Sequence, residues 1–368
     1  MSKGGLYIHI PFCASRCNYC NFYSSVQNQK AYDEYTTALC DALLQNKVRF
    51  SVPFDTLYIG GGTPTVLGAE NLEKIILSAK PYLTKNPEIT VECNPADSLF
   101  KTFSTLCSVG VNRLSIGVQS ANEKELKTLG RRHRNADVIR TVNDARSAGI
   151  DNISLDLMLG IPYQTLETLK ESLDFLLGLN PTHISAYILK IEPDTPFGRA
   201  EKLPSLPDGD TVALMYEETA KILKENGFLH YEISNFAKPD FRSKHNIKYW
   251  QDAEYWGVGP SAYSYIGGKR FHYENDIQKF IENPVEIFDE NGGGRFEYVM
   301  LSLRTSDGVN LKEYETRFGE FPKSAVKRAE NLALHGIAEV TPEKISLTEK
   351  GFLVSNSAIL KILGDDFD

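Results

Sequence analysis

Three cysteines lie within one short segment of the chain. Cys13, Cys17 and Cys20 stand in the run Cys-Ala-Ser-Arg-Cys-Asn-Tyr-Cys, directly after an apolar stretch that ends at Phe12. Three thiolates on one loop can bind three irons of a four-iron, four-sulfur (4Fe-4S) cubane. The fourth iron then has no protein ligand and can chelate the amino and carboxylate groups of the methionine part of S-adenosylmethionine (SAM). The spacing therefore predicts a 4Fe-4S cluster with one open iron.

A zinc site is the alternative interpretation of the same segment. His9 could join the three cysteines as a Cys₃His set. Structural zinc sites usually bring two separated pairs of ligands together, whereas here all four candidates fall within twelve residues. This difference favours iron–sulfur over zinc. The other cysteines, Cys40, Cys93 and Cys107, lie in apolar patterns and are expected to be buried thiols.

Polar residues recur at or near the ends of the predicted strands. Gly60–Pro64 reads Gly-Gly-Gly-Thr-Pro, Glu92 stands in Val-Glu-Cys-Asn-Pro, and Gln119 in Ser-Ile-Gly-Val-Gln. Asp156 lies inside a strand pattern and needs a partner there; Arg131 could supply it, or could face the SAM carboxylate. A purely structural core has no need of so many polar groups at strand ends, so together they predict a ligand site.

The elements that must position these residues alternate between strands and helices. Apolar runs predict strands at Leu6–Ile10, Thr56–Gly60, Glu88–Cys93, Arg113–Gly117, Asn152–Leu159 and His183–Leu189. Three- and four-residue apolar spacing predicts helices at Ala31–Lys47, Ala69–Tyr82, Leu99–Val109, Ala136–Ser147, Leu166–Leu177 and Asp210–Asn226. Six parallel βα units fall short of the eight of a closed barrel. We expect an α/β fold with a partial (βα)₆ barrel; a doubly wound open sheet is the alternative.

A second, smaller unit is expected at the C-terminal end. Leu203–Asp208 looks like a loop, and the polar, glycine-rich break at Asn291–Gly294 predicts a boundary between domains at 1–290 and 295–368. Beyond it, three helical stretches and a hairpin pattern at Ala338–Leu347 predict a winged-helix-like fold. The usual association of that shape is DNA binding, but this segment lacks a basic stripe.

Composition narrows the classes of partner. The chain has 368 residues and a formal net charge of −8, is 42% hydrophobic, and has no long run of Lys and Arg. Nucleic acid is therefore not an expected partner. No stretch resembles an apolar membrane span of about 20 residues, and Leu6–Phe12 is too short for a signal peptide. We expect a cytoplasmic, reducing compartment, in which cysteines act as metal ligands or free thiols.

These motifs resemble the radical SAM superfamily, and within it the group around oxygen-independent coproporphyrinogen III dehydrogenase. The resemblance covers about residues 5 to 360 and rests on Tyr-Ile-His-Ile-Pro-Phe-Cys, Gly-Gly-Gly-Thr-Pro, Gly-Val-Gln-Ser and Asp-Leu-Met-Leu-Gly-Ile-Pro. The HemW-type haem chaperones are the most similar members of this group. The resemblance implies that positions lining a first SAM are Tyr7, Gly61, Glu92 and Lys190. It also implies that positions lining a second SAM or a substrate are Tyr19, Gly62, Thr63, Gln119, Arg131 and Asp156.

Two departures separate the chain from the dehydrogenases. Their cysteine motif continues with a further cysteine, where this chain has Phe22, and they carry an extension ahead of the first strand for which Cys13 leaves no room. His245–Trp250 resembles the His-Asn-x-x-Tyr-Trp motif of the haem chaperones, so His245 is a hypothetical axial haem ligand; the same run could equally fill a structural seam. Relatives often have a cysteine shortly before this motif, whereas Ser243 stands here, which argues against a thiolate link to haem.

The resemblance implies a haem chaperone that binds a 4Fe-4S cluster, SAM and haem and hands haem to apoproteins. The alternative is an enzyme of porphyrin metabolism that decarboxylates coproporphyrinogen III. A zinc-stabilised binding module is a third possibility. Neither the residues nor the resemblance predicts an oligomeric state.

Overall fold

Six parallel strands form the centre of one large sheet. The computed structural model describes residues 4–45, 53–96, 98–201 and 205–367. The central strands follow chain order: β1 (Gly5–Ile10), β2 (Phe54–Gly61), β3 (Leu83–Cys93), β4 (Arg113–Gln119), β5 (Asn152–Leu159) and β6 (His183–Ile188). All five neighbouring pairs are parallel. The expected partial barrel is confirmed, and the doubly wound alternative, which reverses strand order at its centre, is wrong.

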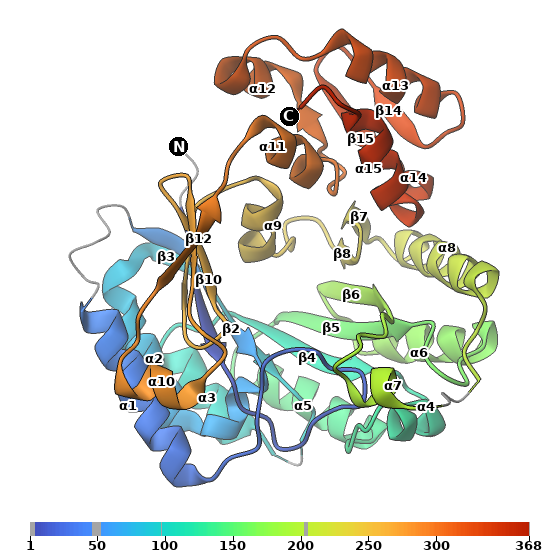
Figure 1. Cartoon of the computed structure of the whole chain (residues 1–368). Helices are drawn as coiled ribbons and strands as arrows, with labels where there is room; N and C mark the ends of the chain where they lie inside the picture. The colour runs from blue at the N-terminus through green and yellow to red at the C-terminus, as the bar shows by residue number, and fades with distance from the viewer. Residues whose placement is uncertain (1–3, 46–52, 97, 202–204, 368) are drawn as a thin grey trace.

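The helices that follow these strands lie along the outer side of the sheet (Figure 1). They are α1 (Gln29–Gln45), α2 (Ala69–Ala79), α3 (Phe100–Ser108), α5 (Asn135–Ser147), α6 (Leu166–Gly178) and α8 (Gly209–Glu225). Each overlaps a predicted helix; Lys47, the predicted end of the first, lies outside the described residues. The predicted helix Ala69–Tyr82 divides into α2 and the 3₁₀ turn η2 (Lys80–Tyr82), because Pro81 cannot continue the α-helical hydrogen bonding. Short turns complete this part: η1 (Pro64–Leu67), α4 (Glu123–Thr128) and α7 (Pro196–Arg199).

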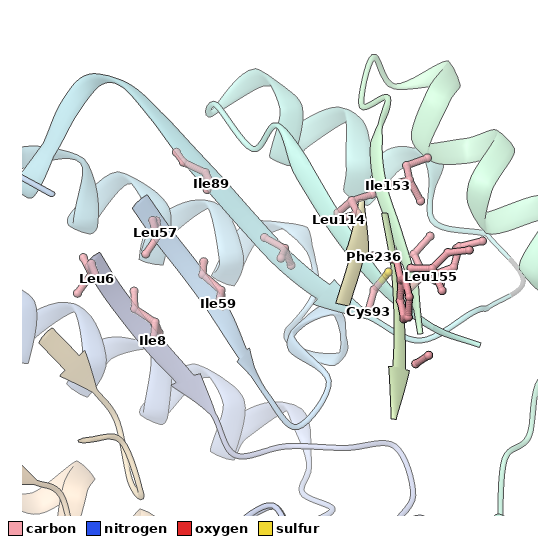
Figure 2. Close-up of a cluster of buried hydrophobic side chains, with 14 of the residues drawn as sticks. Leu6, Ile8, Leu57, Ile59, Ile89, Cys93, Leu114, Ile153, Leu155 and Phe236 are labelled. Atoms are coloured by element: carbon pink, nitrogen blue, oxygen red, sulfur yellow. The ribbon is translucent and has the colours of Figure 1, made fainter. Parts of the chain in front are cut away.

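The two faces of the central strands differ in chemistry because side chains alternate along a strand. The outward face is apolar, and Figure 2 shows Leu6, Ile8, Leu57 and Ile59 on neighbouring strands beneath the helices. The inward face carries polar side chains in register across strands, such as Glu92 opposite Ser115. Helices bury the first face, and the second is left to line the interior of the partial barrel.

Further strands extend the sheet at both edges. Beyond β6 lie β8 (Asn235–Ala237) and β7 (Leu229–Glu232); beyond β1 lie β9 (Tyr255–Val258), β10 (Tyr263–Ile266), β11 (Lys269–His272) and β12 (Ile287–Asn291). Two short helices accompany them, α9 (Lys244–Trp250) and α10 (Ile277–Glu282). The sequence did not predict these strands, because runs of three to five residues show too few alternations to stand out.

A separate three-stranded sheet characterises the C-terminal part, at the top of Figure 1. The three predicted helices are α11 (Arg295–Ser302), α12 (Leu311–Phe318) and α13 (Lys323–Ala333). The sheet contains β13 (Val309–Asn310), β14 (Ala338–Val340) and β15 (Lys344–Leu347). It is followed by two further helices, α14 (Glu349–Leu353) and α15 (Ser355–Leu363). The predicted hairpin is thus confirmed. The break at Asn291–Gly294 falls between β12 and α11, and its role as a domain boundary stays a prediction.

Two other sequence predictions can be compared with the structure. Leu203 and Pro204, the start of the predicted loop, lie outside the described residues, and Asp208 at its end caps α8 by accepting a hydrogen bond from the Thr211 amide at 2.8 Å. Among the described residues, no helix has the length and apolar content required to cross a membrane.

Candidate active site: a cavity above the cysteine loop

The cysteine loop leaves the end of β1 and is held in place by backbone hydrogen bonds. The Gly62 amide donates to the Ile10 carbonyl at 2.8 Å, and the Thr63 amide donates to the Phe12 carbonyl at 2.7 Å. Farther along, the Asn18 amide donates to the Leu129 carbonyl at 3.0 Å, which ties the loop to the turn after α4. None of the loop cysteines forms a disulfide. The loop is therefore held at its start and again at Asn18, and its three cysteines are free thiols.

The carboxyl ends of the central strands and this loop enclose a cavity of about 450 Å³. Most of the predicted site residues line it: Cys13, Cys17, Cys20, Tyr19, Gly61, Gly62, Thr63, Glu92, Gln119, Arg131, Asp156 and Lys190. They come from the loop and from several strands, and so are brought together by the parallel order of the sheet. One cavity thus unites the cysteines with the polar strand ends.

Two predicted site residues do not line this cavity. The Tyr7 hydroxyl lies 2.9 Å from Nδ1 of His9 and holds the His9 ring in place. His245, on α9, is 1% exposed; its Nδ1 lies 2.8 Å from the Thr56 hydroxyl and its Nε2 2.9 Å from the Tyr249 hydroxyl. Burial lowers the pKa of His245 to about 3. Both ring nitrogens of His245 thus face neighbouring hydroxyls in this structure, and its role as an axial haem ligand stays a prediction.

The glycines of the Gly-Gly-Gly-Thr-Pro run are required by the protein's own packing. Gly61 has φ +106°, and a Cβ there would lie 2.4 Å from the His9 ring. A Cβ on Gly62 would lie 2.4 Å from the Phe12 carbonyl oxygen. The sequence predicted that glycine allows a ligand to approach; the structure adds that glycine allows β2 to pack against the start of the cysteine loop.

Glu92 presents a carboxylate to the cavity from β3. Its Oε1 accepts from the Tyr58 hydroxyl at 2.7 Å, and its Oε2 accepts from the Gly61 amide at 3.1 Å. Burial, with a smaller effect from the negative charge of Asp156, raises the pKa of Glu92 to about 7. Carboxylates in polar sites usually ionise well below this value. Glu92 is therefore held in place by two donors yet remains poised between its neutral and charged forms.

Arg131 connects the cysteine loop to the strand ends. One guanidinium nitrogen donates to Cys17 Sγ at 3.5 Å; the other donates to Asn94 Oδ1 at 2.6 Å and to the Gly117 carbonyl. Asn94 in turn donates to the Thr63 hydroxyl at 2.8 Å, and that hydroxyl points to Cys13 Sγ at 3.6 Å. Two of the three thiols thus receive hydrogen-bond donors, an arrangement that stabilises sulfur carrying negative charge.

The hydrogen-bond partner of Asp156 differs from the one suggested by the sequence. Its Oδ1 accepts from the Ser115 hydroxyl at 3.2 Å, whereas the three hydrogen bonds of Arg131 go elsewhere. Burial raises the pKa of Asp156 to about 6, and hydrogen bonds from Ser185 and Ser115 oppose this rise. The prediction of a partner inside the strand is confirmed, but the partner is a hydroxyl on the neighbouring strand.

The geometry of His9 argues against the zinc alternative. Its Nε2 lies 3.0 Å from the Tyr23 carbonyl, which can only accept, so Nε2 carries the proton. Nδ1 then accepts from the Tyr7 hydroxyl. Within the described part of the chain, no three His, Cys, Asp or Glu side chains are grouped closely enough to share one metal ion. A cubane does not require such grouping, because each thiolate binds a different iron.

Several lining residues were not predicted. Asn94, Ser115 and Tyr187 line the cavity, and so does Cys93, which is buried as predicted. Cys40 and Cys107 are half-buried against the core. The signal for Asn94 was its place directly after Glu92 and Cys93 at the end of β3. Ser115 could have been found from its alternation with apolar neighbours in β4, a pattern that marks an inward polar face.

The mouth of the cavity has an apolar rim. Phe22, on the cysteine loop, is 66% exposed, and Tyr187 and Ile188, at the end of β6, are each 42% exposed. All three line the cavity. Lys190 follows this rim and forms an ion pair with Glu192 at 2.6 Å while remaining largely exposed. The rim thus offers exposed apolar side chains, and the cation of Lys190 lines the same cavity.

Comparisons with known proteins agree with this arrangement. The family model of the radical SAM superfamily matches residues 7–176. HemW haem chaperones match nearly the whole chain: that of Lactococcus lactis is 35% identical and that of Escherichia coli 38% identical, each over 98% of both chains. The chain belongs to the HemW family. The HemW protein of Bacillus subtilis is also 35% identical, over 98% of this chain and 99% of its own.

The HemW family assignment also accounts for the C-terminal part and the fold. Residues 295–354 match the family model of the HemN C-terminal domain. The solved structure of coproporphyrinogen III oxidase (HemN) from Escherichia coli, described there as a radical SAM enzyme, superposes with a TM-score of 0.84 over 98% of this chain and 90% of that chain. At 23% identity this likeness concerns the fold. This chain and the HemN structure therefore share the partial barrel and the small C-terminal unit.

Proposed function

We propose that this protein is a cytoplasmic haem chaperone that binds a 4Fe-4S cluster, SAM and haem and transfers haem to target apoproteins. The support from relatives is the match to HemW haem chaperones over nearly the whole chain. The support from the structure is a single cavity that joins the three free thiols to an apolar rim. This juxtaposition carries the proposal, since one cavity is lined both by the candidate cluster ligands and by exposed apolar side chains.

Cys13, Cys17 and Cys20 are the proposed cluster ligands. They are free thiols on a loop pinned by backbone hydrogen bonds, and Thr63 and Arg131 direct donors to two of the sulfurs. Burial and the neighbouring thiols raise the pKa of Cys20, so cluster assembly must release a proton there. A cluster held by these cysteines would supply the single electron that cleaves SAM reductively. The residues themselves fix the cluster and exclude bulk water.

SAM is proposed to occupy the cavity between the loop and the strand ends. Glu92 is suited to accept from ribose hydroxyls because Tyr58 and Gly61 hold its carboxylate rigidly. Gln119 ends β4 with φ +71°, an uncommon backbone conformation that aims its amide into the cavity. Tyr19, Asp156 and Lys190 complete the wall, where the family resemblance assigns contacts with SAM or a second ligand.

Haem is proposed to bind at the mouth, against Phe22, Tyr187 and Ile188. A porphyrin needs a wide apolar surface, and its propionates favour a nearby cation such as Lys190. Phe22 occupies the position at which the dehydrogenases carry a further cysteine, so in this chain an exposed aromatic ring replaces a thiol at the rim. His245 does not contribute to this surface while Thr56 and Tyr249 hold its ring.

The test is a haem titration of the reconstituted protein, followed by absorption, beside product analysis after anaerobic incubation with coproporphyrinogen III, SAM and a reductant. We expect saturable haem binding, weakened at least tenfold in the double variant Phe22→Ser/Tyr187→Ser, and no protoporphyrinogen. The expected factor follows from the loss of two aromatic contacts, each contributing about 1 kcal/mol or more. Protoporphyrinogen formed over many turnovers would instead identify the coproporphyrinogen-decarboxylating enzyme.

A further inference from the structure

Asn94, at the end of β3, contacts both of the side chains that direct donors at the loop sulfurs. Its Oδ1 accepts from Arg131 at 2.6 Å, and its Nδ2 donates to the Thr63 hydroxyl at 2.8 Å. Thr63 and Arg131 in turn reach Cys13 Sγ at 3.6 Å and Cys17 Sγ at 3.5 Å. The amide of Asn94 is thus connected to two of the three sulfurs, through one intermediate side chain in each case.

The direction of these hydrogen bonds follows from the chemistry of the groups. A guanidinium can only donate, so the end of the Asn94 side chain that faces Arg131 must be its carbonyl oxygen. The other end is then the NH₂ group, which donates to the Thr63 oxygen. The hydrogen of the Thr63 hydroxyl is thereby left for Cys13 Sγ. Arg131 therefore orients Asn94, and Asn94 orients Thr63 toward the sulfur.

The surroundings of Asn94 hold its side chain in this orientation. Pro95 follows it directly and restricts its backbone. A Cβ on Gly117 would lie 2.9 Å from both Asn94 Oδ1 and Arg131 Nη2, so β4 packs directly against the contact between these two side chains. Asn94 also lines both the cavity above the loop and a neighbouring cavity of about 310 Å³. It therefore belongs to the wall between the two cavities, in a position fixed by backbone on one side.

We propose that Asn94 is a positioning residue that raises the reduction potential of the cluster by directing the Thr63 hydroxyl at Cys13. The inference rests on the cluster of the proposed function and adds a residue that tunes it. One-electron reduction adds negative charge that the sulfurs share, and hydrogen bonds to the sulfurs are among the determinants of the potential of such clusters. A donor aimed at a ligating sulfur stabilises the reduced form more than the oxidised form, because its hydrogen bond strengthens with the charge of the acceptor.

The second donor depends less on Asn94. Arg131 also donates to the Gly117 carbonyl, and this acceptor remains when the Asn94 side chain is shortened. The contact between Arg131 and Cys17 should therefore persist in such a variant. The Thr63 hydroxyl, by contrast, accepts its hydrogen bond from Asn94. The effect of Asn94 on the cluster should consequently pass through Thr63.

A redox titration of the cluster-loaded protein with dithionite and mediator dyes, followed by absorption and electron paramagnetic resonance, tests this role. The variant is Asn94→Ala. The control is Asn112→Ala, which removes an asparagine that bonds to the backbone of Ile89 and Pro87 at the amino end of the sheet. At a fixed potential the ratio of oxidised to reduced cluster should rise roughly tenfold in the variant, a fall in potential of about 59 mV for one electron, because one charge-assisted hydrogen bond is lost. The control should match wild type.

A double variant shows whether Asn94 acts through Thr63. Thr63→Val alone should lower the potential by a similar amount, and adding Asn94→Ala should lower it little further, because both changes remove the same donor. An unchanged potential in Asn94→Ala would overturn the proposal, and so would two full shifts that add in the double variant. Wild-type protein that holds no iron would refute the cluster of the proposed function, whereas an unshifted potential in iron-loaded Asn94→Ala would refute the role of Asn94 alone.

Asn94→Asp decides the same question if Asn94→Ala cannot hold the cluster. This change preserves the size of the side chain, but a carboxylate can only accept, so it takes the Thr63 hydrogen away from Cys13. Its potential should fall because the donor is lost and because a negative charge is added. Only the second contribution remains in a Thr63→Val background, so the shift should be smaller there. A shift of equal size in both backgrounds would overturn the proposal.

Discussion

Replacing Glu92 by Gln changes a charged acceptor into a neutral one while preserving its shape. The carboxylate accepts from Tyr58 and Gly61 in the described structure. The amide introduced by Glu92→Gln can keep both contacts if its oxygen faces Gly61 and the Tyr58 hydroxyl turns to accept. If Glu92 accepts from the ribose of SAM, the substitution removes a charge-assisted hydrogen bond. Such bonds contribute about 1.5–3 kcal/mol, so the Kd for SAM should rise roughly 10- to 100-fold.

The raised pKa of Glu92 adds a pH dependence to this prediction. With a pKa of about 7, only about one tenth of the protein carries the ionised acceptor at pH 6, against about nine tenths at pH 8. Because the apparent Kd varies inversely with the competent fraction, wild-type SAM affinity should tighten about tenfold between pH 6 and pH 8. Any titration of SAM itself affects both proteins equally, so the ratio of the Kd of Glu92→Gln to that of wild type should increase over this range.

Equilibrium dialysis of SAM with cluster-loaded protein at pH 6, 7 and 8 is the assay. Glu88→Gln is a matched control: Glu88 lies on the same strand and its pKa is also raised by burial, but it accepts from the Lys244 amide at 3.0 Å, away from the cavity. The control should bind SAM like wild type. A Kd ratio between Glu92→Gln and wild type that stays flat across pH, or a Glu88→Gln effect as large as that of Glu92→Gln, would refute the assignment of Glu92 to SAM.

Four further outcomes are expected. Cys17→Ala should abolish the iron content and visible absorption of the reconstituted protein, whereas Cys93→Ala should retain both; iron lost from the second variant would contradict the ligand assignment. Gly61→Ala should lower the free energy of unfolding by more than about 2 kcal/mol, since the added Cβ meets the His9 ring. The control Gly68→Ala also has a positive φ (+80°), but its added Cβ has no atom within 4 Å, so it should cost only about 1 kcal/mol. Equal costs of the two variants in denaturant unfolding would contradict the packing argument. His245→Phe should destabilise the protein by roughly 2–4 kcal/mol because two buried hydroxyls lose their partner, with haem affinity unchanged; a lower haem affinity at unchanged stability would identify His245 as the ligand. The stabilising contribution of protonated Glu92 should be fully present below its ordinary pKa of 4.5 and lost as pH rises through about 7. Cluster-free Glu92→Gln should therefore gain about 2.5 kcal/mol in the free energy of unfolding relative to wild type between pH 5 and pH 8, which denaturant unfolding at the two pH values would detect.

The sequence predicted the central strands and most of the cavity because both depend on local patterns. Apolar strands of six to eleven residues leave a clear signal, and the parallel order places their carboxyl ends at one edge, so polar residues there converge on one site. What the sequence could not predict was which way a side chain faces when its partners lie far away in the chain. The hydroxyl of Thr56 bonds to the ring of His245, although the two residues are 189 positions apart in the sequence. Arg131 and Cys17, which also form a hydrogen bond, are 114 positions apart.

The same reasoning explains why Asp156 bonds to Ser115 and not to Arg131, the partner that the sequence suggested. A strand acid requires a partner, and Arg131 had the right charge, but three other acceptors closer to its guanidinium compete for it. Ser115 lies on the neighbouring strand, two positions before Gly117, the register partner of Asp156, and supplies a hydroxyl without any added charge. Register between strands, which no local pattern encodes, decided the pairing.

Transfer of haem is the most direct test of the proposed function. Cluster-bearing protein loaded with one equivalent of haem is mixed anaerobically with a haem-depleted acceptor enzyme, and the recovery of the acceptor's haem-dependent activity is followed over time. The proposal predicts recovery that saturates with acceptor concentration and is lost in Phe22→Ser/Tyr187→Ser, which removes the aromatic rings of the apolar rim. Recovery no faster than that given by free haem, or equal in wild type and the rim variant, would contradict it.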